Sequence, residues 1–308
     1  MCVIMKISST LKVAPVRCVV YGAGGIGKST MCAGAPGAVF IRTEQGLNNI
    51  DALAVDDPKT WEDIIKSVDF LANEPSCKTL VIDSIDWAEP MCWDSLCRTK
   101  PTEKGVFVSD IEDYGFGKGY KHAVGMWRHL ISRLDKACDN GKNVVLIAHS
   151  QRKVVRNLSG EDYESCVIKL QELGCNIIRE WADVVGFAEL DIDTISDGGK
   201  RKTAKAVSSG RRVLRVGTSP AHCGKSKYSI SDTIDLSWES LASAIEASRT
   251  MSISDMSAEL ESLLSELGSD DVASSAYKYL GASPLAHMYS KAIKSVRLKI
   301  EEKKNEKH

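Results

Sequence analysis

Residues 19–30 read Val-Val-Tyr-Gly-Ala-Gly-Gly-Ile-Gly-Lys-Ser-Thr, an apolar run that passes through four glycines into a lysine and two hydroxyl residues. From Gly22 to Ser29 the spacing is G-x-x-x-x-G-K-[ST], with every fixed position filled. A strand is expected before this motif and a helix after it, which is the setting that a phosphate-binding loop requires. Glycines let backbone N–H groups curl around phosphates in conformations that a side chain would forbid. The motif therefore predicts a nucleotide site at the junction of a strand and a helix.

The same motif assigns roles to its residues. Lys28 is expected to reach the β- and γ-phosphates, and the Ser29 hydroxyl to ligate Mg²⁺. The glycine spacing also satisfies a dinucleotide fingerprint, but the Lys-Ser pair and the lack of a ribose-binding acid after the next strand favour a triphosphate. ATP and Mg²⁺ are the predicted cofactors. The predicted nucleotide-binding residues are Gly22, Ala23, Gly24, Gly25, Ile26, Gly27, Lys28, Ser29 and Thr30.

Composition excludes several classes of protein. The chain has 308 residues and a net charge of −1, so a polyanionic partner would have to be bound by a local basic patch. Its ten cysteines form no Cys-x-x-Cys pair, which indicates reduced thiols. No apolar run approaches the roughly 20 residues that span a bilayer, and the N-terminal apolar stretch is too short for a secretory signal. We therefore expect a cytoplasmic protein without a membrane partner.

Apolar runs of strand length alternate with helical patterns through the first 190 residues, as in a mostly parallel α/β sheet with helices on both faces. Strands are expected over Val16–Tyr21, Ala38–Arg42, Thr79–Asp83, Asn143–Ala148 and Asp183–Glu189, and helices over Lys28–Ala35, Thr60–Ala72, Tyr120–Cys138 and Trp238–Ala247. Gly198–Val216 predicts a hairpin with Ser209-Gly210 at its turn. Two further amphipathic helices are expected after Met251. The predicted domains are a core, residues 1–248, and a helical C-terminal appendage, residues 249–308.

Polar residues end three of the expected strands. Asp83 follows Leu80-Val-Ile, where a carboxylate can bind Mg²⁺ directly or through water. Glu44 follows the second strand, where it either orients the attacking water beside the γ-phosphate or lies in a surface loop. His149 follows the fourth strand and is either a γ-phosphate sensor or a hydrogen-bonded histidine at the edge of the core.

Taken with the phosphate loop, these strand ends resemble a RecA-type ATPase core. Phe40-Ile-Arg-Thr-Glu44-Gln-Gly-Leu47 resembles the RecA segment whose glutamate activates water, Val81-Ile-Asp83-Ser84 its Walker B segment, and Leu146-Ile-Ala-His149 its γ-phosphate-sensing strand end. The resemblance implies a RecA-like P-loop NTPase fold that hydrolyses ATP. It also implies Glu44, Lys28 and His149 as catalytic residues, with Ser29 and Asp83 holding the metal.

A closer likeness is to phage-encoded RecA-like ATPases of the single-strand-annealing (Sak-type) recombination group. It covers roughly residues 14–245 and is carried by Asp113-Tyr-Gly-Phe-Gly-Lys-Gly-Tyr120, Trp127-Arg, Ala148-His-Ser150, Arg179-Glu-Trp-Ala-Asp183 and Arg212-Val-Leu-Arg215 leading to Thr218-Ser-Pro220. Related proteins often carry Lys-Asn-Arg-Tyr/Phe-Gly near the end of the core, with basic residues that act across a subunit interface. The corresponding residues here are Lys225-Ser-Lys227-Tyr228-Ser, so Lys225 and Lys227 are the trans-acting candidates. A lysine is a point charge and not a bidentate fork, so this departure predicts weakened hydrolysis.

Basic residues gather in two segments that could contact nucleic acid. Between Gly198 and Tyr228 there are nine basic residues and no acidic one. Such a hairpin could follow a phosphate backbone, form a subunit interface or be simply a solvated face. Gln151–Cys175 corresponds to the mobile DNA-contacting loop of RecA-like proteins. The predicted DNA-binding residues are Arg152, Lys153, Arg156, Lys200, Arg201, Lys202, Arg211 and Arg212.

The leading hypothesis is a DNA-stimulated ATPase of phage recombination that binds single-stranded DNA and promotes annealing or loads a recombination or single-strand-binding protein. A homo-oligomer, either a ring or a filament, in the host cytoplasm is implied. The rival hypothesis is a nucleotide-gated protein-interaction module with little turnover. A small-molecule kinase is a third class, for which no arginine-rich lid pattern is present.

Overall fold

The computed structural model describes residues 15–44, 50–157, 160–196 and 204–281, together with 288–289, 292–293, 295–296 and 299–300. The chain divides into a large compact unit, Pro15–Ala244, and a second unit that holds the C-terminal residues from Ile245. Across the described ranges, no helix is long and apolar enough to cross a membrane. The described cysteines are all free thiols.

The large unit is built on one mixed sheet with the strand order β10-β8-β7-β1-β5-β4-β2-β3. From β7 to β3 every neighbouring pair is parallel, while β8 pairs antiparallel with both β7 and β10. β6 pairs with β5, and β9 pairs with β7. The strands are β1 (Arg17–Gly22), β2 (Ala38–Arg42), β3 (Leu53–Ala54), β4 (Thr79–Asp83), β5 (Asn143–Val155), β6 (Tyr163–Ile168), β7 (Val184–Ser196), β8 (Ala204–Arg215), β9 (Lys225–Ser226) and β10 (Thr233–Asp235).

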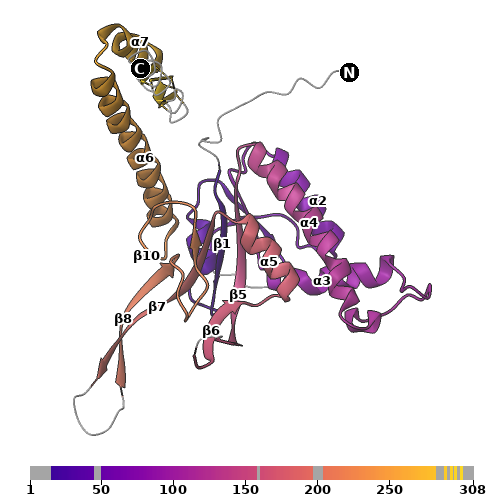
Figure 1. The fold of residues 1–308 in the computed structure, drawn as a ribbon. Coiled ribbons are helices and arrows are strands. Elements are labelled where there is room, and N and C mark those ends of the chain that lie inside the picture. The colour runs from indigo at the N-terminus through magenta and orange to yellow at the C-terminus, as the bar shows by residue number, and fades with distance from the viewer. Residues whose placement is uncertain are drawn as a thin grey trace, which may run out of the picture. The chain divides into compact units, whose positions relative to one another are not determined.

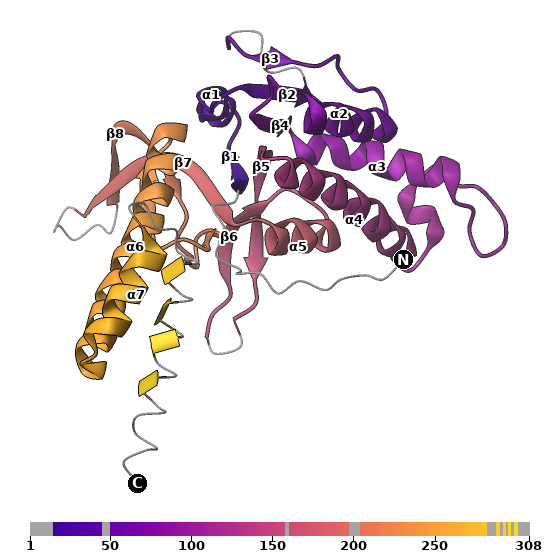
Figure 2. The ribbon, with the colours of Figure 1, turned by 90° about the horizontal axis from the view of Figure 1, so that it is seen from above.

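Helices cover both faces of this sheet (Figures 1 and 2). α2, α3, α4 and α5 share one face, and α1 lies on the other. The helices of the large unit are α1 (Lys28–Ala33), α2 (Trp61–Asn73), α3 (Ile85–Thr99), the 3₁₀ turn η1 (Ile111–Tyr114), α4 (Lys118–Asp139), α5 (Glu172–Trp181) and the first part of α6 (Trp238–Leu267). This arrangement is the RecA-like P-loop NTPase fold that the sequence predicts.

Local signals explain where the helices begin. Thr60 caps α2 by accepting a hydrogen bond from the Asp63 backbone N–H, and the Asp63 carboxylate accepts one in return from the Thr60 N–H. This reciprocal capping satisfies two backbone donors that would otherwise lack partners at the helix start. The side chain of Gln171 caps α5 in the same position.

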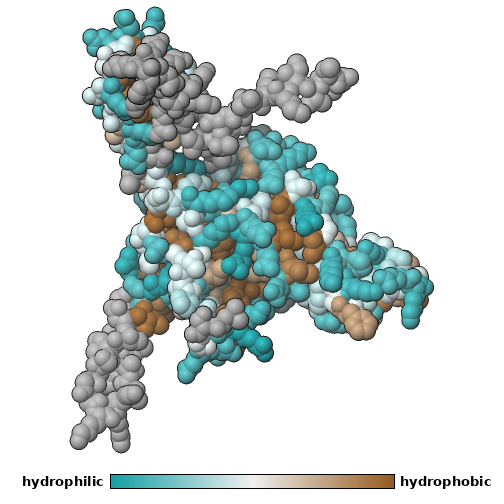
Figure 3. Space-filling model, viewed as in Figure 1, coloured by the Kyte–Doolittle hydropathy of each residue, from teal (hydrophilic) through white to brown (hydrophobic). Residues whose placement is uncertain are grey.

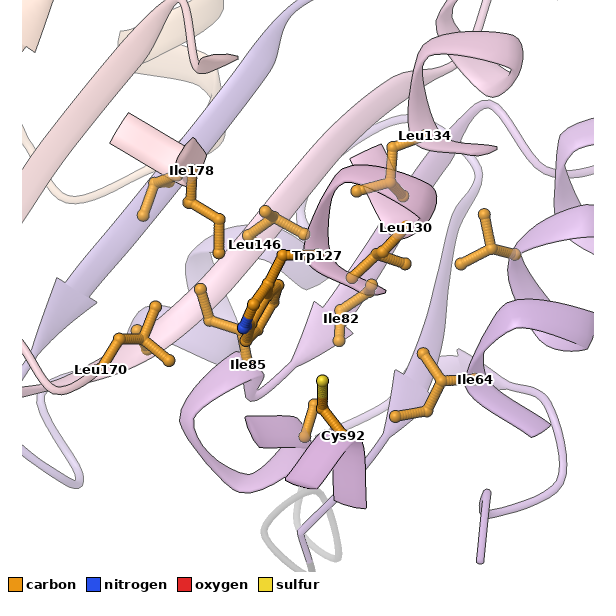
Figure 4. Close-up of a cluster of buried hydrophobic side chains, with 14 of the residues drawn as sticks. Ile64, Ile82, Ile85, Cys92, Trp127, Leu130, Leu134, Leu146, Leu170 and Ile178 are labelled. Atoms are coloured by element: carbon orange, nitrogen blue, oxygen red, sulfur yellow. The ribbon is translucent and has the colours of Figure 1, made fainter. Parts of the chain in front are cut away.

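The core on the α2–α5 face is centred on Trp127 of α4 (Figure 4). Its indole meets Trp61 of α2 edge to face, with ring centroids 5.3 Å apart, a favourable aromatic geometry. A Cβ atom at Gly174 of α5 would lie 2.8 Å from Trp127 Nε1. Glycine at this position therefore lets α5 approach α4 closely, and it places α5 against the strands that carry the site.

Two sequence-based expectations were wrong in this unit. The expected hairpin turn at Ser209-Gly210 does not form, because both residues lie within β8, which pairs with β7 instead. Gly210 has φ +76° and lies where the β7–β8 register shifts, so this glycine marks a bulge and not a turn. Gln151–Cys175, expected to be a mobile loop, forms the antiparallel β5–β6 hairpin and the start of α5.

The C-terminal unit contains the remainder of α6 and α7 (Asp270–Leu280). The expected helix over Trp238–Ala247 and the first amphipathic helix of the appendage are one continuous α6, which passes through the predicted boundary at residue 248. Apolar residues of these helices form a small core of their own that includes Leu260, Leu264 and Leu267, together with Ile293 and Val296.

Candidate nucleotide-binding and hydrolysis site

Four strands bring the predicted site residues to one edge of the sheet. The register aligns Gly22 of β1 with His149 of β5, and Asp83 of β4 with Ile147 of β5. Arg42, the last residue of β2, lies opposite Asp83, and Glu44 follows two residues later. Because these strands are parallel, the residues at their carboxyl ends meet at the same edge, where ligands bind in open α/β sheets.

The phosphate loop leaves β1 and enters α1 in a conformation that its glycines permit. Gly25 and Gly27 have φ values of +74° and +108°, which disfavour residues that carry a side chain. A Cβ atom at Gly22 would collide with the carbonyl oxygen of Ala188 in β7. The loop is therefore fixed both by backbone conformation and by the close approach of a neighbouring strand.

Lys28 lies buried inside the loop. Its ammonium donates to the carbonyl oxygens of Gly22 and Ala23, at 3.0 and 2.8 Å. Burial lowers the pKa of Lys28, while the carboxylates of Asp83 and Glu44 oppose this shift. The buried ammonium of Lys28 has only neutral carbonyl groups as hydrogen-bond partners. A buried charge is stabilised by a partner of opposite charge, so Lys28 favours the binding of an anion at the centre of the loop.

Ser29 and Asp83 form a candidate magnesium site. The Ser29 hydroxyl donates to Asp83 Oδ2 at 2.6 Å. The carboxylate is buried, and its other oxygen, Oδ1, has no hydrogen-bond partner among the described residues. Burial raises the pKa of Asp83, and the Ser29 hydrogen bond and Lys28 oppose the rise. A buried carboxylate oxygen without a partner beside a hydroxyl suits Mg²⁺, which commonly takes one or two protein oxygens and completes its shell with phosphate and water.

Glu44 and His149 lie side by side at the edge of the loop. His149 Nδ1 is 4.0 Å from Glu44 Oε2. A Cβ atom at Gly24 would lie 3.9 Å from His149 Nε2, so this ring nitrogen faces the phosphate loop. Burial raises the pKa of Glu44, whereas His149 acts to lower it. The arrangement places a carboxylate and an imidazole next to each other beside Gly24 of the phosphate loop.

Asp86 orients the His149 ring and was not singled out from the sequence. Its Oδ1 accepts the His149 backbone N–H and its Oδ2 lies 3.0 Å from His149 Nδ1. A carboxylate that accepts from Nδ1 fixes the ring and leaves Nε2 directed away from it. No local pattern signals this contact, because Asp86 lies in the first turn of α3 and His149 lies 63 residues later, at the end of the parallel part of β5.

Thr43 is a second residue near the site whose contribution was not predicted from the sequence. Its hydroxyl donates to the Ser84 carbonyl at 2.6 Å and accepts the Ser84 N–H at 2.8 Å, and its own N–H donates to the Asp83 carbonyl. These three bonds join the ends of β2 and β4. Thr43 therefore holds Glu44 and Asp83 in a fixed relation.

A family model described as an AAA domain matches residues 14–228, which contain every residue of the site described above. The chain belongs to this family. A solved structure, the flagellar accessory protein FlaH from Methanocaldococcus jannaschii, is similar with a TM-score of 0.35 and 12% identity over 72% of this chain and 84% of that chain. No curated protein matches.

Lys225 and Lys227, the candidates for action across a subunit interface, both make contacts within their own chain. Lys225 donates to the carbonyls of Arg179, Glu180 and Ala182 at 2.7–2.9 Å, which uses all three donors of an ammonium group. Lys227 pairs with Asp183 at 2.8 Å. A role across a subunit interface remains a prediction, and it would require Lys225 to leave the C-terminal end of α5.

The predicted DNA-binding residues that the structure describes lie on or next to the strand pairs β5–β6 and β7–β8. Arg152 and Lys153 on β5 are exposed and lie 3.9 and 3.8 Å from the carboxylates of Glu164 and Glu172. Arg156 is exposed near the tip of the same hairpin. Lys200, Arg201 and Lys202 lie outside the described residues, between β7 and β8. Arg211 pairs with Asp235 at 2.7 Å, whereas Arg212 lies against the phosphate loop.

Proposed function

We propose that this chain is an Mg-ATP-hydrolysing protein of phage DNA recombination, which binds single-stranded DNA and promotes annealing or the loading of a recombination partner. The observation that carries the hydrolytic part is the meeting of Glu44, His149 and the Ser29–Asp83 pair around one phosphate loop. The AAA domain match supports nucleotide hydrolysis in general terms.

The roles in hydrolysis follow from these positions. Lys28 and the loop N–H groups bind the phosphates, and Lys28 exchanges its carbonyl partners for phosphate oxygens. Glu44 orients the attacking water and accepts its proton. His149 Nε2 faces the γ-phosphate from a ring that Asp86 positions. Mg²⁺, held by Ser29 and Asp83, would neutralise charge that develops on the phosphate oxygens.

The DNA-binding part of the proposal rests on charge and shape. β7 and β8 extend away from the rest of the sheet as a two-stranded arm (Figure 1). The residues that join them include Lys200, Arg201 and Lys202. Three consecutive cations in the sequence that connects β7 to β8 suit a phosphate backbone, and a ring or filament would bring several copies of this connection together.

One observation favours the rival function, a nucleotide-gated interaction module with little turnover. Both trans-acting candidates are engaged in cis, Lys225 with backbone carbonyls and Lys227 with Asp183. A trans-acting cation is worth about 10³–10⁵ in turnover in P-loop enzymes that use an arginine. Without one, the chain would bind ATP and hydrolyse it slowly.

ATPase rates with and without single-stranded DNA separate these functions, measured together with the mass of the assembled species. We expect Lys28→Ala to abolish nucleotide binding. Glu44→Gln is expected to retain ATP binding and to lose turnover by about 10²–10⁴-fold, the usual contribution of a general base. Turnover that persists in Lys28→Ala would refute the site, and a wild-type chain that binds ATP but never DNA, even at low salt, would leave only the interaction module.

A further inference from the structure

The exposed side chain of Arg212 lies beside the phosphate loop, although it belongs to β8, on the far side of β7. A Cβ atom at Gly27 would lie 3.0 Å from Arg212 Nη1 and 3.7 Å from its Cδ. The Arg212 carbonyl accepts the Leu236 N–H at 3.0 Å, and Leu236 Cδ2 lies 3.7 Å from the same Cβ position. A guanidinium and an aliphatic side chain thus border the loop together.

The charge of Arg212 distinguishes it from its neighbours in β8. Arg211 pairs with Asp235, and Arg215 pairs with Glu189 and Asp191. Within the described part of the chain, no carboxylate lies within ion-pair distance of Arg212. Its guanidinium therefore approaches a loop that already contains Lys28, and two cations gathered in this way suit a bound anion.

The loop has two distinguishable ends. His149 Nε2 faces Gly24, and His149 adjoins Glu44, so the hydrolytic residues lie at the Gly24 end. Arg212 and Leu236 lie at Gly27. A triphosphate whose γ-phosphate meets Glu44 and His149 has its α-phosphate and nucleoside directed away from them, toward the Gly27 end.

We infer that Arg212 and Leu236 form the wall of the site that receives the α-phosphate and nucleoside of the bound nucleotide, in cis. The guanidinium binds the phosphate and the Leu236 side chain contacts the apolar face of the base or ribose. This inference rests on the proposed ATP site and adds a specificity element to it. It also makes the base of the β7–β8 arm part of the nucleotide site.

Equilibrium binding of ATP and ADP to the full chain in the presence of Mg²⁺ tests the inference. We expect Arg212→Ala to weaken the binding of both nucleotides by about tenfold. Arg212→Lys is expected to weaken it less, because lysine keeps the positive charge and loses only the bidentate fork. His149→Ala is expected to weaken ATP and leave ADP unchanged. Arg128→Ala, which removes an exposed arginine from α4, is the matched control and is expected to bind both nucleotides as the wild type does.

Leu236→Ala distinguishes the contact of Leu236 with the nucleoside from the contact of Arg212 with the phosphate. This variant is expected to weaken ADP several-fold while binding pyrophosphate as the wild type does, whereas Arg212→Ala weakens both ligands. If Arg212→Ala binds ADP as tightly as Arg128→Ala does, the inference is overturned and the proposed ATPase stands. If Arg212→Ala weakens the binding of ATP but not of ADP, Arg212 contacts the γ-phosphate instead, and the inference is overturned as well. A wild-type chain that binds neither nucleotide would overturn the proposed function together with the inference.

Discussion

Glu89 is a buried carboxylate that links two helices on the face opposite to α1. Both of its oxygens accept the Gln171 backbone N–H at 3.1 Å, so α3 is tied to the start of α5. Burial raises the pKa of Glu89 from its ordinary value near 4.5 to about 7, with Asp86 adding to the rise and the Gln171 N–H opposing it. The folded chain consequently holds a proton on Glu89 at pH values where the unfolded chain has lost it.

Stability is therefore expected to fall as pH rises from about 4.5 to about 7 through this one group. Glu89→Gln keeps an acceptor for Gln171 and removes the titration. We expect the variant to match the wild type near pH 4 and to exceed its free energy of unfolding at pH 8 by on the order of 2 kcal/mol. Urea denaturation at the two pH values measures this difference. Equal stability of the two proteins at pH 8 would contradict it.

At the residue scale, the sequence predicted the groups that belong to a continuous motif. The structure brings Lys28, Ser29 and Asp83 together at the phosphate loop, and their roles in binding nucleotide and metal stay predictions. Asp86, Thr43 and Arg212 were not assigned to the site, because each reaches it through a contact between strands or helices distant in sequence. Periodicity and motif spacing carry no information about such contacts.

At the scale of elements, the parallel strands were predictable because buried β-branched runs are continuous in the sequence. Three helices gave weaker signals. α3 contains Pro90 in its interior, which normally interrupts a helix. α5 has only ten residues, and α7 follows a short break after α6. The sheet order places β8 and β10 beyond β7, and no local pattern indicates that antiparallel extension.

Gly210 offers a test of the corrected β8. Its φ of +76° is costly for a residue with a Cβ atom, by roughly 1–2 kcal/mol. Gly210→Ala should therefore lower the free energy of unfolding by about that amount. Gly125→Ala is the matched control, since Gly125 lies inside α4 with open space around a Cβ atom, and alanine there should stabilise the helix by about 0.5–1 kcal/mol. Thermal unfolding of both variants should shift in opposite directions, and a stabilised Gly210→Ala would show that the bulge is absent.

The chain as a whole has a net charge of −1, so DNA binding would require a local patch of basic residues. On the face shown in Figure 3, most residues are hydrophilic and the apolar residues form separate patches. The β5–β6 hairpin carries Arg152 and Lys153 beside Glu164 and Glu172, which partly neutralises it. Asp197 is the one acidic residue in the 197–203 connection of the β7–β8 arm, where three cations follow in succession. The arm is consequently the stronger candidate for a phosphate backbone.

The salt dependence of single-stranded DNA binding decides between the two hairpins. Each phosphate contact in single-stranded DNA contributes about 0.7 to the slope of log K against log salt, so replacing Lys200, Arg201 and Lys202 by alanine should lower the slope by about 2. Replacing Arg152, Lys153 and Arg156 should lower it by less, since two of these cations already have carboxylate neighbours. The charge-matched control replaces Lys104, Lys121 and Arg128, which are exposed elsewhere on the large unit, and should leave the slope unchanged. Fluorescence anisotropy over a range of NaCl concentrations measures all three variants. Equal slopes for the arm variant and the control would remove the arm from the DNA-binding surface, because counterion release is a direct count of the phosphates that these cations neutralise.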